Sequence, residues 1–197
     1  LLESLLQQSY NNIEIICCDG KSTDDTVKTL EQFKAQHPGI FTIYKNDENL
    51  GYIKNFEKCL SLCNGELIAI ADHDDVWKPH KITTLVNAIG NAMMVYSDSA
   101  YINETNNDTG KKISDIFRLH DCPNPDAFIF YDFIWGHSIL LKKELLEYAL
   151  PIPDKMPYDT WLAYTAASIS HIYYVDDTWT NCRHHQDSCT AFMLEKK

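Results

Sequence analysis

The sequence lacks several features that mark other classes of protein. Its apolar runs, of which Met93–Tyr96 is typical, fall well short of the roughly 20 residues that a membrane-spanning helix needs. The first ten residues contain Glu3 and no basic residue, so we expect no secretory signal there. We find no internal repeat and no low-complexity linker. These absences favour a single domain over residues 1–197.

Positive charge is also scarce. The chain has 17 lysine and arginine residues against 28 aspartate and glutamate residues, which gives a formal net charge of −11 and a pI near 5.0. Because no basic stripe is present to follow a phosphate backbone, we predict no nucleic-acid partner. An anionic ligand would therefore need a bridging cation or local backbone N–H donors.

Cysteine is present, but the patterns that give it a structural role are missing. The seven cysteines are an odd number, and none form a C-x-x-C pair. Free cysteine packs as a small apolar residue, and a hydrophobic content of 45% supplies a core that needs no disulfide. We therefore expect a reducing, cytoplasmic compartment. Zinc is a weaker alternative, because Cys59 and Cys63 lack a second well-spaced pair.

Helical and strand patterns alternate through the first half of the chain. Short apolar runs beside glycine or proline predict strands, and amphipathic stretches predict helices. The resulting α-β-α-β-α-β-α-β order implies right-handed crossovers and a mostly parallel sheet flanked by helices. The predicted elements are a helix over 1–8, a strand over 13–18, a helix after 22–25 that ends by 37–39, a strand over 40–44, a helix over 52–63, a strand over 67–71, a helix over 79–89 and a strand over 93–96.

The pattern changes after residue 97. Residues 98–126 are polar and rich in turn formers, which predicts a long loop of the kind that is usually functional or mobile. The aromatic stretch 128–135 follows it. The later predicted elements are a strand over 137–141, a helix over 143–150, a proline-rich loop to 157, a helix over 158–168, a strand over 171–175 and an irregular remainder.

The most informative segment is Asp-His-Asp-Asp at 72–75, directly after the predicted strand 67–71. In open parallel sheets, ligands bind beyond the carboxyl ends of strands. Like charges crowded there repel each other, and a divalent cation offsets that repulsion. Mg²⁺ and Mn²⁺ favour carboxylate oxygens and often keep substrate phosphates as further ligands. The simpler alternative is a polar turn in which Asp75 helps to cap the next helix.

Two further polar groups follow earlier strands. Asp19 ends the first predicted strand, where a carboxylate could accept a hydrogen bond from a nucleobase N–H. Asn49 and Gly51 precede a helix that carries Lys54 and Asn55, and Gly51 frees the backbone for a close approach to a ligand. Each signal is weak alone, because an ordinary loop before an ordinary helix has the same composition.

Taken together, the segments 19–26, 49–55 and 72–77 resemble family 2 of the glycosyltransferases, the inverting type with the GT-A fold. The resemblance covers nearly the whole chain in order and spacing, and the form of 72–77 is similar to bacterial polysaccharide and rhamnosyltransferase-like members. It implies an α/β fold of the GT-A (nucleotide-diphospho-sugar transferase) type, a nucleotide-diphosphate sugar as donor and Mn²⁺ or Mg²⁺ as cofactor. It also implies a nucleotide-binding half over 1–97 and an acceptor-binding half over 98–197.

The resemblance assigns roles to individual residues. The metal falls to Asp72 and Asp74, with Asp74 the first choice as direct ligand, and to His185 near the end of the chain. Asp159 is the base that takes the proton from the acceptor hydroxyl. The metal stabilises the departing diphosphate, and in-line displacement inverts the anomeric configuration. The implied donor-binding residues are Asp19, Asn49, Gly51, Lys54, Asn55, Asp72 and His73, and the implied acceptor- or sugar-binding residues are Asp98, Trp135, Gly136 and His137.

Plainer interpretations of the later residues stay open. Asp159 follows Pro157 and is also a suitable acid for the first turn of a helix, and Gly136 also suits a simple turn into a strand. Because a carboxylate at Asp19 suits a pyrimidine imide, we expect a UDP- or dTDP-sugar. The expected acceptor is a glycan or a lipid-linked glycan, which would bring the domain to the inner membrane face. The loop 98–126 and the stretch 128–135 are hypothesised to shape the acceptor site.

One departure from the family pattern stands out. Family members begin with a strand whose final turn holds the base and ribose, whereas this sequence starts inside the helix that follows it. We therefore expect a sheet that lacks its first strand, with an exposed edge. A non-catalytic module of the same fold that binds nucleotide or glycan is the first alternative function.

A different metal enzyme is the second alternative. Nucleotidyltransferases favour a glycine-rich basic loop near the start, and none is visible. Phosphatases of the haloacid dehalogenase type carry Asp-x-Asp early, whereas here it sits in the middle of the chain at 72–74. The predicted strands exclude an all-helical His-Asp phosphohydrolase. We therefore prefer the glycosyltransferase interpretation.

Overall fold

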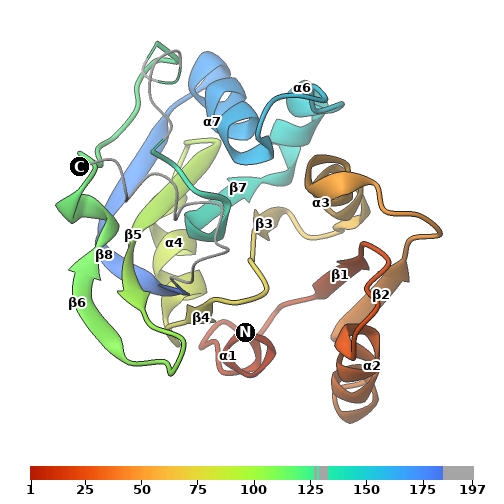
Figure 1. The fold of residues 1–197 in the computed structure, drawn as a ribbon. Helices are drawn as coiled ribbons and strands as arrows, with labels where there is room; N and C mark the ends of the chain where they lie inside the picture. The colour runs from red at the N-terminus through yellow and green to blue at the C-terminus, as the bar shows by residue number, and fades with distance from the viewer. Residues whose placement is uncertain (127, 129–132, 184–197) are drawn as a thin grey trace.

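A computed structural model describes residues 1–126, 128 and 133–183 of the chain (Figure 1). Helices and strands alternate over the first half, and a longer run of strands fills the second. The helices are α1 (Leu2–Leu6), α2 (Thr26–Gln36), α3 (Gly51–Leu62), α4 (Lys81–Ile89), α6 (Leu146–Ala149) and α7 (Tyr158–Ile169), with 3-10 turns η1 (Ile113–Asp115), η2 (Gly136–Ser138) and η3 (Lys143–Leu145). The strands are β1 (Ile15–Asp19), β2 (Phe41–Lys45), β3 (Leu67–Ala69), β4 (Val76–Trp77), β5 (Met94–Ile102), β6 (Asp108–Lys112), β7 (Ile139–Lys142) and β8 (Ile172–Arg183).

The strands form two sheets. β1 and β2 make a parallel pair, and the larger sheet has the order β3-β7-β5-β8-β4 with β6 added to β5. Within the larger sheet only β5 and β8 run parallel, while the β3–β7, β5–β7, β4–β8 and β5–β6 pairs are antiparallel. The α/β prediction is confirmed, but a mostly parallel sheet is wrong for this part. β6 returns on β5 as a hairpin and β7 runs antiparallel to both β3 and β5, whereas β8, which follows α7, runs parallel to β5.

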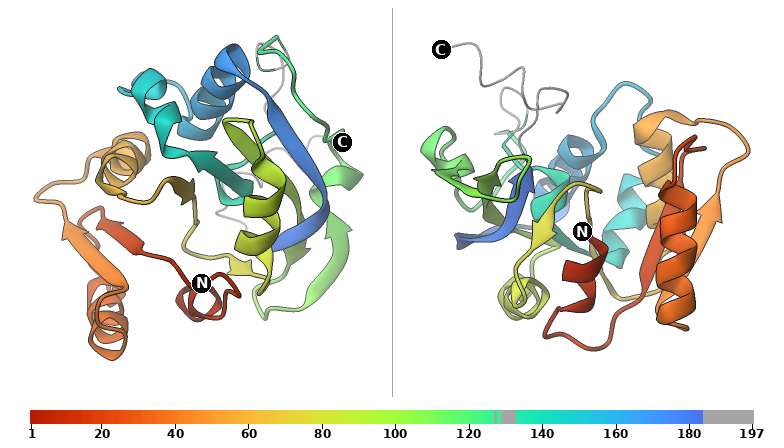
Figure 2. Two further views of the ribbon diagram at one scale, coloured as in Figure 1. Left: turned by 180° about the vertical axis from the view of Figure 1, so that it is seen from behind. Right: turned by 60° about the horizontal axis from the view of Figure 1, so that its bottom comes forward.

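The two sheets stand apart. Figures 1 and 2 show the β1–β2 pair, with α2 beside it, on one side of the molecule and the larger sheet on the other. A cavity of about 570 Å³ lies between β1 and β3, lined by apolar side chains such as Ile16, Leu60 and Ile68. Among the described residues, β3 is hydrogen-bonded to β7 alone. This arrangement agrees with the expectation of a sheet that lacks one strand.

The core of the larger sheet has two faces, which alternate along β5. Met94 and Tyr96 pack into the cluster that contains α7, and Val95 packs into the cluster that contains α4. Because successive side chains of a strand point to opposite faces, the sheet is covered by α7 on one face and by α4 on the other. A third cluster joins α1, β1 and Trp77 of β4. The larger sheet is therefore a rigid support for the loops at its edge.

Four strands differ from the prediction, because β5 also extends to Ile102, into the segment expected as a loop. β4 and β6 fall where loops were expected, and β8 continues to Arg183 although an irregular segment was predicted after 175. β6 is exposed along its whole length and forms only because a turn at 103–107 folds it back on β5. In β8, residues 176 and 177 are set aside by a register shift, after which pairing with β5 resumes at Thr178.

The expected division of the chain at residues 97 and 98 falls inside β5. The two halves therefore share a strand, and their separate roles stay a prediction. Within the described part of the chain, none of the helices combines the length and the apolar character that crossing a membrane requires.

Candidate active site

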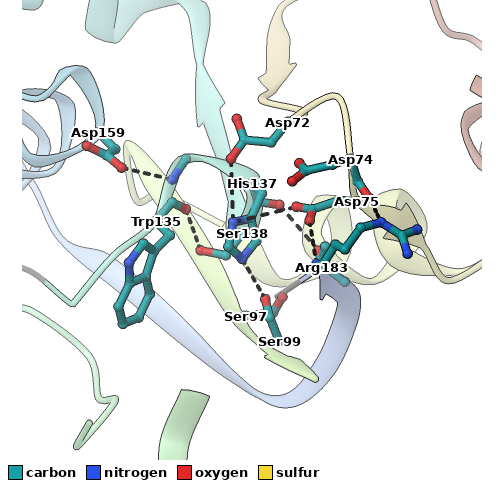
Figure 3. Close-up of polar contacts among 12 residues, drawn as sticks. Asp72, Asp74, Asp75, Ser97, Ser99, Trp135, His137, Ser138, Asp159 and Arg183 are labelled. Atoms are coloured by element: carbon teal, nitrogen blue, oxygen red, sulfur yellow. Dashed lines mark hydrogen bonds and ion pairs between the residues drawn. The ribbon is translucent and has the colours of Figure 1, made fainter. Parts of the chain in front are cut away.

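The acidic loop 72–75 carries two half-buried carboxylates, of which Asp72 faces His137, and one fully buried carboxylate (Figure 3). Asp72 and Asp74 are half-buried, His73 is exposed, and Asp75 is 1% exposed. A backbone hydrogen bond from the Asp75 N–H to the Asp72 carbonyl, 3.4 Å, closes the turn. The predicted metal ligands Asp72 and Asp74 therefore lie at the surface of the loop, while Asp75 belongs to its support.

Asp75 ties the loop to β8 and to η2. Its Oδ1 accepts the backbone N–H of Arg183 at 3.2 Å, and its Oδ2 lies 3.6 Å from Nδ1 of His137. Burial raises the pKa of the Asp75 carboxyl, and the charge of His137 opposes that rise. Helix α4 begins after His80 without a side-chain cap, so the alternative in which Asp75 caps that helix is wrong.

His137 lies behind the acidic loop and is 4% exposed. Its Nδ1 is 3.7 Å from Oδ2 of Asp72, and its Nε2 is 3.0 Å from the Ser99 hydroxyl. Burial disfavours the charged ring, but the nearby carboxylates of Asp72 and Asp75 outweigh it and raise the pKa of His137. The predicted sugar contact is therefore corrected, because the ring is enclosed and faces the carboxylates that it supports (Figure 3).

Lys81 is a site residue that the sequence did not reveal. It is 0% exposed, and its Nζ donates to the His137 carbonyl at 2.5 Å and to the Thr180 hydroxyl at 2.9 Å. The same nitrogen lies 3.6 Å from the ring centroid of Trp77. Desolvation lowers the pKa of Lys81 to about 7, and the charges of Asp75 and Asp72 oppose that shift. A lysine at the start of a helix normally faces solvent, so no sequence signal pointed to this burial.

The start of α7 brings Asp159 to the same turn. Oδ2 of Asp159 accepts the backbone N–H of Gly136 at 3.2 Å, and Oδ1 accepts that of Thr160 at 2.9 Å. The preceding Tyr158 is buried and stacks on Phe56 with ring centroids 4.0 Å apart. Burial and the nearby charges of Asp72 and Asp159 raise the pKa of Tyr158. Tyr158 thus lies close to the predicted base and to a predicted metal ligand, although the sequence did not single it out.

Gly136 has no room for a side chain. A Cβ built on Gly136 would lie 2.0 Å from the Tyr158 hydroxyl oxygen and 2.7 Å from Cζ of that ring. Trp135 beside it is partly buried and packs edge-to-face on Phe117, with ring centroids 5.0 Å apart. Close contact with Tyr158 thus explains why glycine stands here, beyond the simple turn expected from the sequence. A contact of Trp135 with an acceptor stays a prediction.

A second group of predicted residues lies at the end of β1. Asp19 is 6% exposed and accepts the backbone N–H groups of Lys21 and Ser22, each at 3.1 Å. Asn55 donates to the Cys18 carbonyl at 2.9 Å and accepts from Asn46 at 2.8 Å. These contacts hold the end of β1 against α3. A role of Asp19 and Asn55 in donor binding stays a prediction.

The segment before α3 has the local geometry that the sequence indicated. The Asn49 side chain accepts the Gly51 N–H at 2.9 Å, and Gly51 has a φ of +74°, where glycine is favoured. The Nζ of Lys54 contacts the Ile152 carbonyl at 2.8 Å, Glu57 at 3.0 Å and Asp154 at 3.1 Å, and its role in donor binding stays a prediction. Hydrogen bonds to Glu57 and Asp154 raise its pKa. Lys54 therefore holds the loop before α7.

Asp98 is buried in the larger sheet. Its Oδ1 accepts the N–H groups of Ser99 at 2.8 Å and Ser114 at 3.2 Å, and Lys112 approaches its Oδ2 at 3.8 Å. It is 1% exposed, so it anchors η1 to β5 and is not open to a sugar in this conformation. The predicted sugar contact of Asp98 is therefore corrected to a structural role.

Arg183 connects the acidic loop to the β5–β6 hairpin. Its Nε donates to the Asp74 carbonyl at 3.0 Å, and its guanidinium also donates to the Asn103 carbonyl at 2.9 Å and to the Asn106 side chain. No role of Arg183 was predicted from the sequence. His185, the predicted third metal ligand, lies outside the described residues.

Two groups in the described part of the chain could hold a cation. Asp72 and Asp74 offer the carboxylate oxygens that Mg²⁺ and Mn²⁺ prefer. Asp75, His137 and Cys182 place ligand atoms within 4.8 Å of one another, but an imidazole and a thiolate suit zinc better, and buried Lys81 places a positive charge beside them. The oxygen-rich outer pair therefore fits the implied metal better.

Comparison with solved structures places this geometry in a known fold. Residues 1–349 of TarS from S. aureus, in complex with UDP-GlcNAc, match with a TM-score of 0.72 at 16% identity, over 95% of this chain and 55% of that chain. The mannosyltransferase PcManGT from Pyrobaculum calidifontis, in complex with GDP-Man and Mn²⁺, matches with a TM-score of 0.69 at 19% identity, over 98% of this chain and 54% of that chain. These likenesses confirm the GT-A fold.

Comparison of sequences identifies the family. WfaP of Escherichia coli, a UDP-Glc:alpha-D-GlcNAc-diphosphoundecaprenol beta-1,3-glucosyltransferase, is 31% identical over 162 residues, which cover 82% of this chain and 62% of that protein. Chondroitin synthase of Escherichia coli is 33% identical over 81 residues, covering 41% and 12%. The chain thus spans less than two thirds of the length of these relatives. Because residues 1–149 match the family described as Glycosyl transferase family 2, the chain belongs to that family.

Proposed function

We propose that this chain is the catalytic domain of a metal-dependent, inverting glycosyltransferase. It would move a sugar from a nucleotide-diphosphate sugar to an acceptor hydroxyl in glycan or polysaccharide synthesis. One observation carries the proposal: Asp72 of the acidic loop and Asp159 of α7 both border η2, where His137 Nδ1 lies 3.7 Å from Asp72 Oδ2 and the Gly136 N–H donates to Asp159 at 3.2 Å. A carboxylate pair that serves metal and base must sit on opposite sides of one reacting centre, and η2 separates the two groups here (Figure 3).

A nucleotide-diphosphate sugar is the substrate class that the relatives support. WfaP is named for UDP-Glc, TarS was solved with UDP-GlcNAc, and PcManGT was solved with GDP-Man and Mn²⁺. For this chain we propose a UDP- or dTDP-sugar, because Asp19 at the end of β1 offers a carboxylate to a pyrimidine imide. The proposed acceptor is a glycan or a lipid-linked glycan.

The chain's own groups give each step a physical basis. Asp159 takes the proton from the acceptor hydroxyl as that oxygen attacks the anomeric carbon. Its carboxylate is oriented by the Gly136 and Thr160 N–H groups and stabilised by the N-terminus of α7. A Mn²⁺ or Mg²⁺ ion bound by Asp72 and Asp74 would supply charge stabilisation for the departing diphosphate.

A conservative change at Asp159 tests this function. The assay follows UDP release from UDP-glucose with a synthetic N-acetylglucosamine diphospholipid as acceptor, and the product anomer is assigned by NMR. Asp159→Asn should lower kcat by about 10²-fold or more while the affinity for UDP stays within about threefold of wild type. Glu147→Gln, an exposed carboxylate on α6, is the matched control.

Two results would argue against the proposal. Full activity of Asp159→Asn would remove its role as base. UDP binding by the wild-type chain without transfer from any UDP- or dTDP-sugar, to this or other glycan acceptors, would favour the non-catalytic module.

A further inference from the structure

We propose that Lys81 is a positioning residue for this transfer reaction, because it fixes the η2 turn that joins the acidic loop to Asp159. The inference rests on the proposed function and adds a residue to it. Lys81 touches neither the metal ligands nor the acceptor directly. It acts through His137, whose carbonyl it binds.

Turn η2 is the common neighbour of both carboxylates. The Gly136 N–H donates to Asp159, and the ring of the next residue, His137, faces Asp72 and Asp75. Any tilt of this short turn therefore moves both ends of the site together. The backbone of the turn is held from the opposite side by contacts to the His137 carbonyl.

Lys81 provides the stronger of these contacts. Its Nζ donates to the His137 carbonyl at 2.5 Å and to the Thr180 hydroxyl of β8 at 2.9 Å, while the Thr180 hydroxyl itself reaches the carbonyl at 3.3 Å. One ammonium group thus joins α4, η2 and β8. The Lys81 contact to the His137 carbonyl is shorter than the Thr180 contact to the same oxygen, so Lys81 does more to set the position of the turn.

The surroundings of Lys81 partly offset the cost of burying its amine. A buried ammonium is costly unless it is paired and hydrogen-bonded. Here the charges of Asp75 and Asp72 and the face of the Trp77 ring compensate it. An apolar side chain would fill the space, but it would leave the His137 carbonyl with the longer Thr180 contact alone. A lysine with only a packing role would not need this directed contact.

The test compares three variants in the UDP-glucose transfer assay. Lys81→Met removes the amine, and Lys78→Met is the matched control. Thr180→Val removes one hydrogen-bond partner of the Lys81 amine but leaves Lys81 in place. Lys78 binds the Thr178 hydroxyl of β8 at 2.7 Å, and within the described part of the chain it makes no hydrogen bond to η2. Steady-state kinetics, calorimetric titration of UDP with Mn²⁺, melting curves and hydrogen exchange of the Gly136 amide are measured for each.

We expect Lys81→Met to lower kcat by about 10- to 100-fold, because a displacement near 1 Å is sufficient for such a loss. Its KM for UDP-glucose and its Kd for UDP should stay within about threefold of wild type, since Asp19 lies on another sheet. Exchange of the Gly136 amide should accelerate about tenfold or more. Thr180→Val should lower kcat by about threefold or more, and Lys78→Met should match wild type.

Three results would overturn the inference. These are an unchanged kcat in folded Lys81→Met, a parallel loss of kcat and UDP affinity, or unchanged exchange at Gly136. If Lys81→Met does not fold, the kcat, the UDP affinity and the Gly136 amide exchange of Thr180→Val decide instead. A wild-type chain without transfer refutes the proposed function instead, and the exchange measurement still decides whether Lys81 holds the turn.

Discussion

Replacing Gly136 by alanine tests the packing that joins the two carboxylates. The new Cβ would lie 2.0 Å from the Tyr158 hydroxyl oxygen and 2.7 Å from Cζ, far inside the contact distance of roughly 3.5 Å. The tyrosine cannot turn away freely, because it is 5% exposed and stacks on Phe56. Gly136 does not use a left-handed φ, so the cost of alanine here is steric.

The expected magnitude follows from this overlap. Overpacking a core costs typically about 1–3 kcal/mol, and an overlap of this size places Gly136→Ala at the upper end, about 3 kcal/mol. For a chain of this length each kcal/mol lowers the melting temperature by about 2–4 °C, so we expect a fall of roughly 6–12 °C. The measurement is thermal unfolding followed by circular dichroism. Gly20→Ala is the control, because its Cβ would meet nothing closer than 3.9 Å.

A second variant separates this clash from other effects. In a Tyr158→Phe background the nearest obstacle, the hydroxyl, is gone, so Gly136→Ala should cost at least about 1 kcal/mol less there than in wild type. A melting temperature of Gly136→Ala within about 2 °C of wild type would refute the reasoning. An equal cost in both backgrounds would show that the tyrosine hydroxyl is not the obstacle.

Two further predictions concern buried or bridging lysines. Because Lys54 binds the Ile152 carbonyl and Asp154, Lys54→Met should speed proteolysis of the loop 151–157. The calorimetric Kd for UDP should stay within about threefold of wild type. A Kd that is tenfold weaker while the loop resists proteolysis would instead support a role of Lys54 in donor binding. The pKa of Lys81 is about 7 in the folded chain and near 10.4 when unfolded, so the unfolded state binds more protons between these values. The difference in the free energy of unfolding between wild type and Lys81→Met should therefore rise with pH across this window, by at most about 1.4 kcal/mol per pH unit. Chemical denaturation at several pH values measures it. A difference that does not change with pH would contradict the lowered pKa of Lys81.

The sequence predicted the elements that carry a periodic apolar pattern. The apolar runs of β1, β2 and β3 and the amphipathic stripe of α3 were all recognisable from spacing. β6 was not, because its residues Asp108–Lys112 are polar and exposed and it exists only through pairing with β5. The far part of β8 was hidden by the acidic pair at 176–177, which resembles a turn and is accommodated as an irregularity in the pairing with β5.

The residues of the candidate site also differ in whether the sequence alone could reveal them. Asp72, Asp74 and Asp159 could be selected because their segments resemble a family pattern. Tyr158 and Lys81 could not, since their importance comes from contacts across 86 and 56 positions of the chain, with Asp72 and His137 respectively. Burial also decides against two selected residues: His137 and Asp98 are polar residues in promising positions, yet both support the site from within the core.

Calorimetric titration of UDP and dTDP, with and without Mn²⁺, on wild type and Asp74→Ala tests whether the acidic loop is a metal-dependent donor site. Asp24→Ala, which replaces an exposed carboxylate before α2, is the control. We expect one of these nucleotides to bind only with Mn²⁺, and we expect that binding to be lost in Asp74→Ala but not in Asp24→Ala. Binding that is equal without the metal, or that is unaffected by Asp74→Ala, would contradict a metal-dependent donor site at the acidic loop.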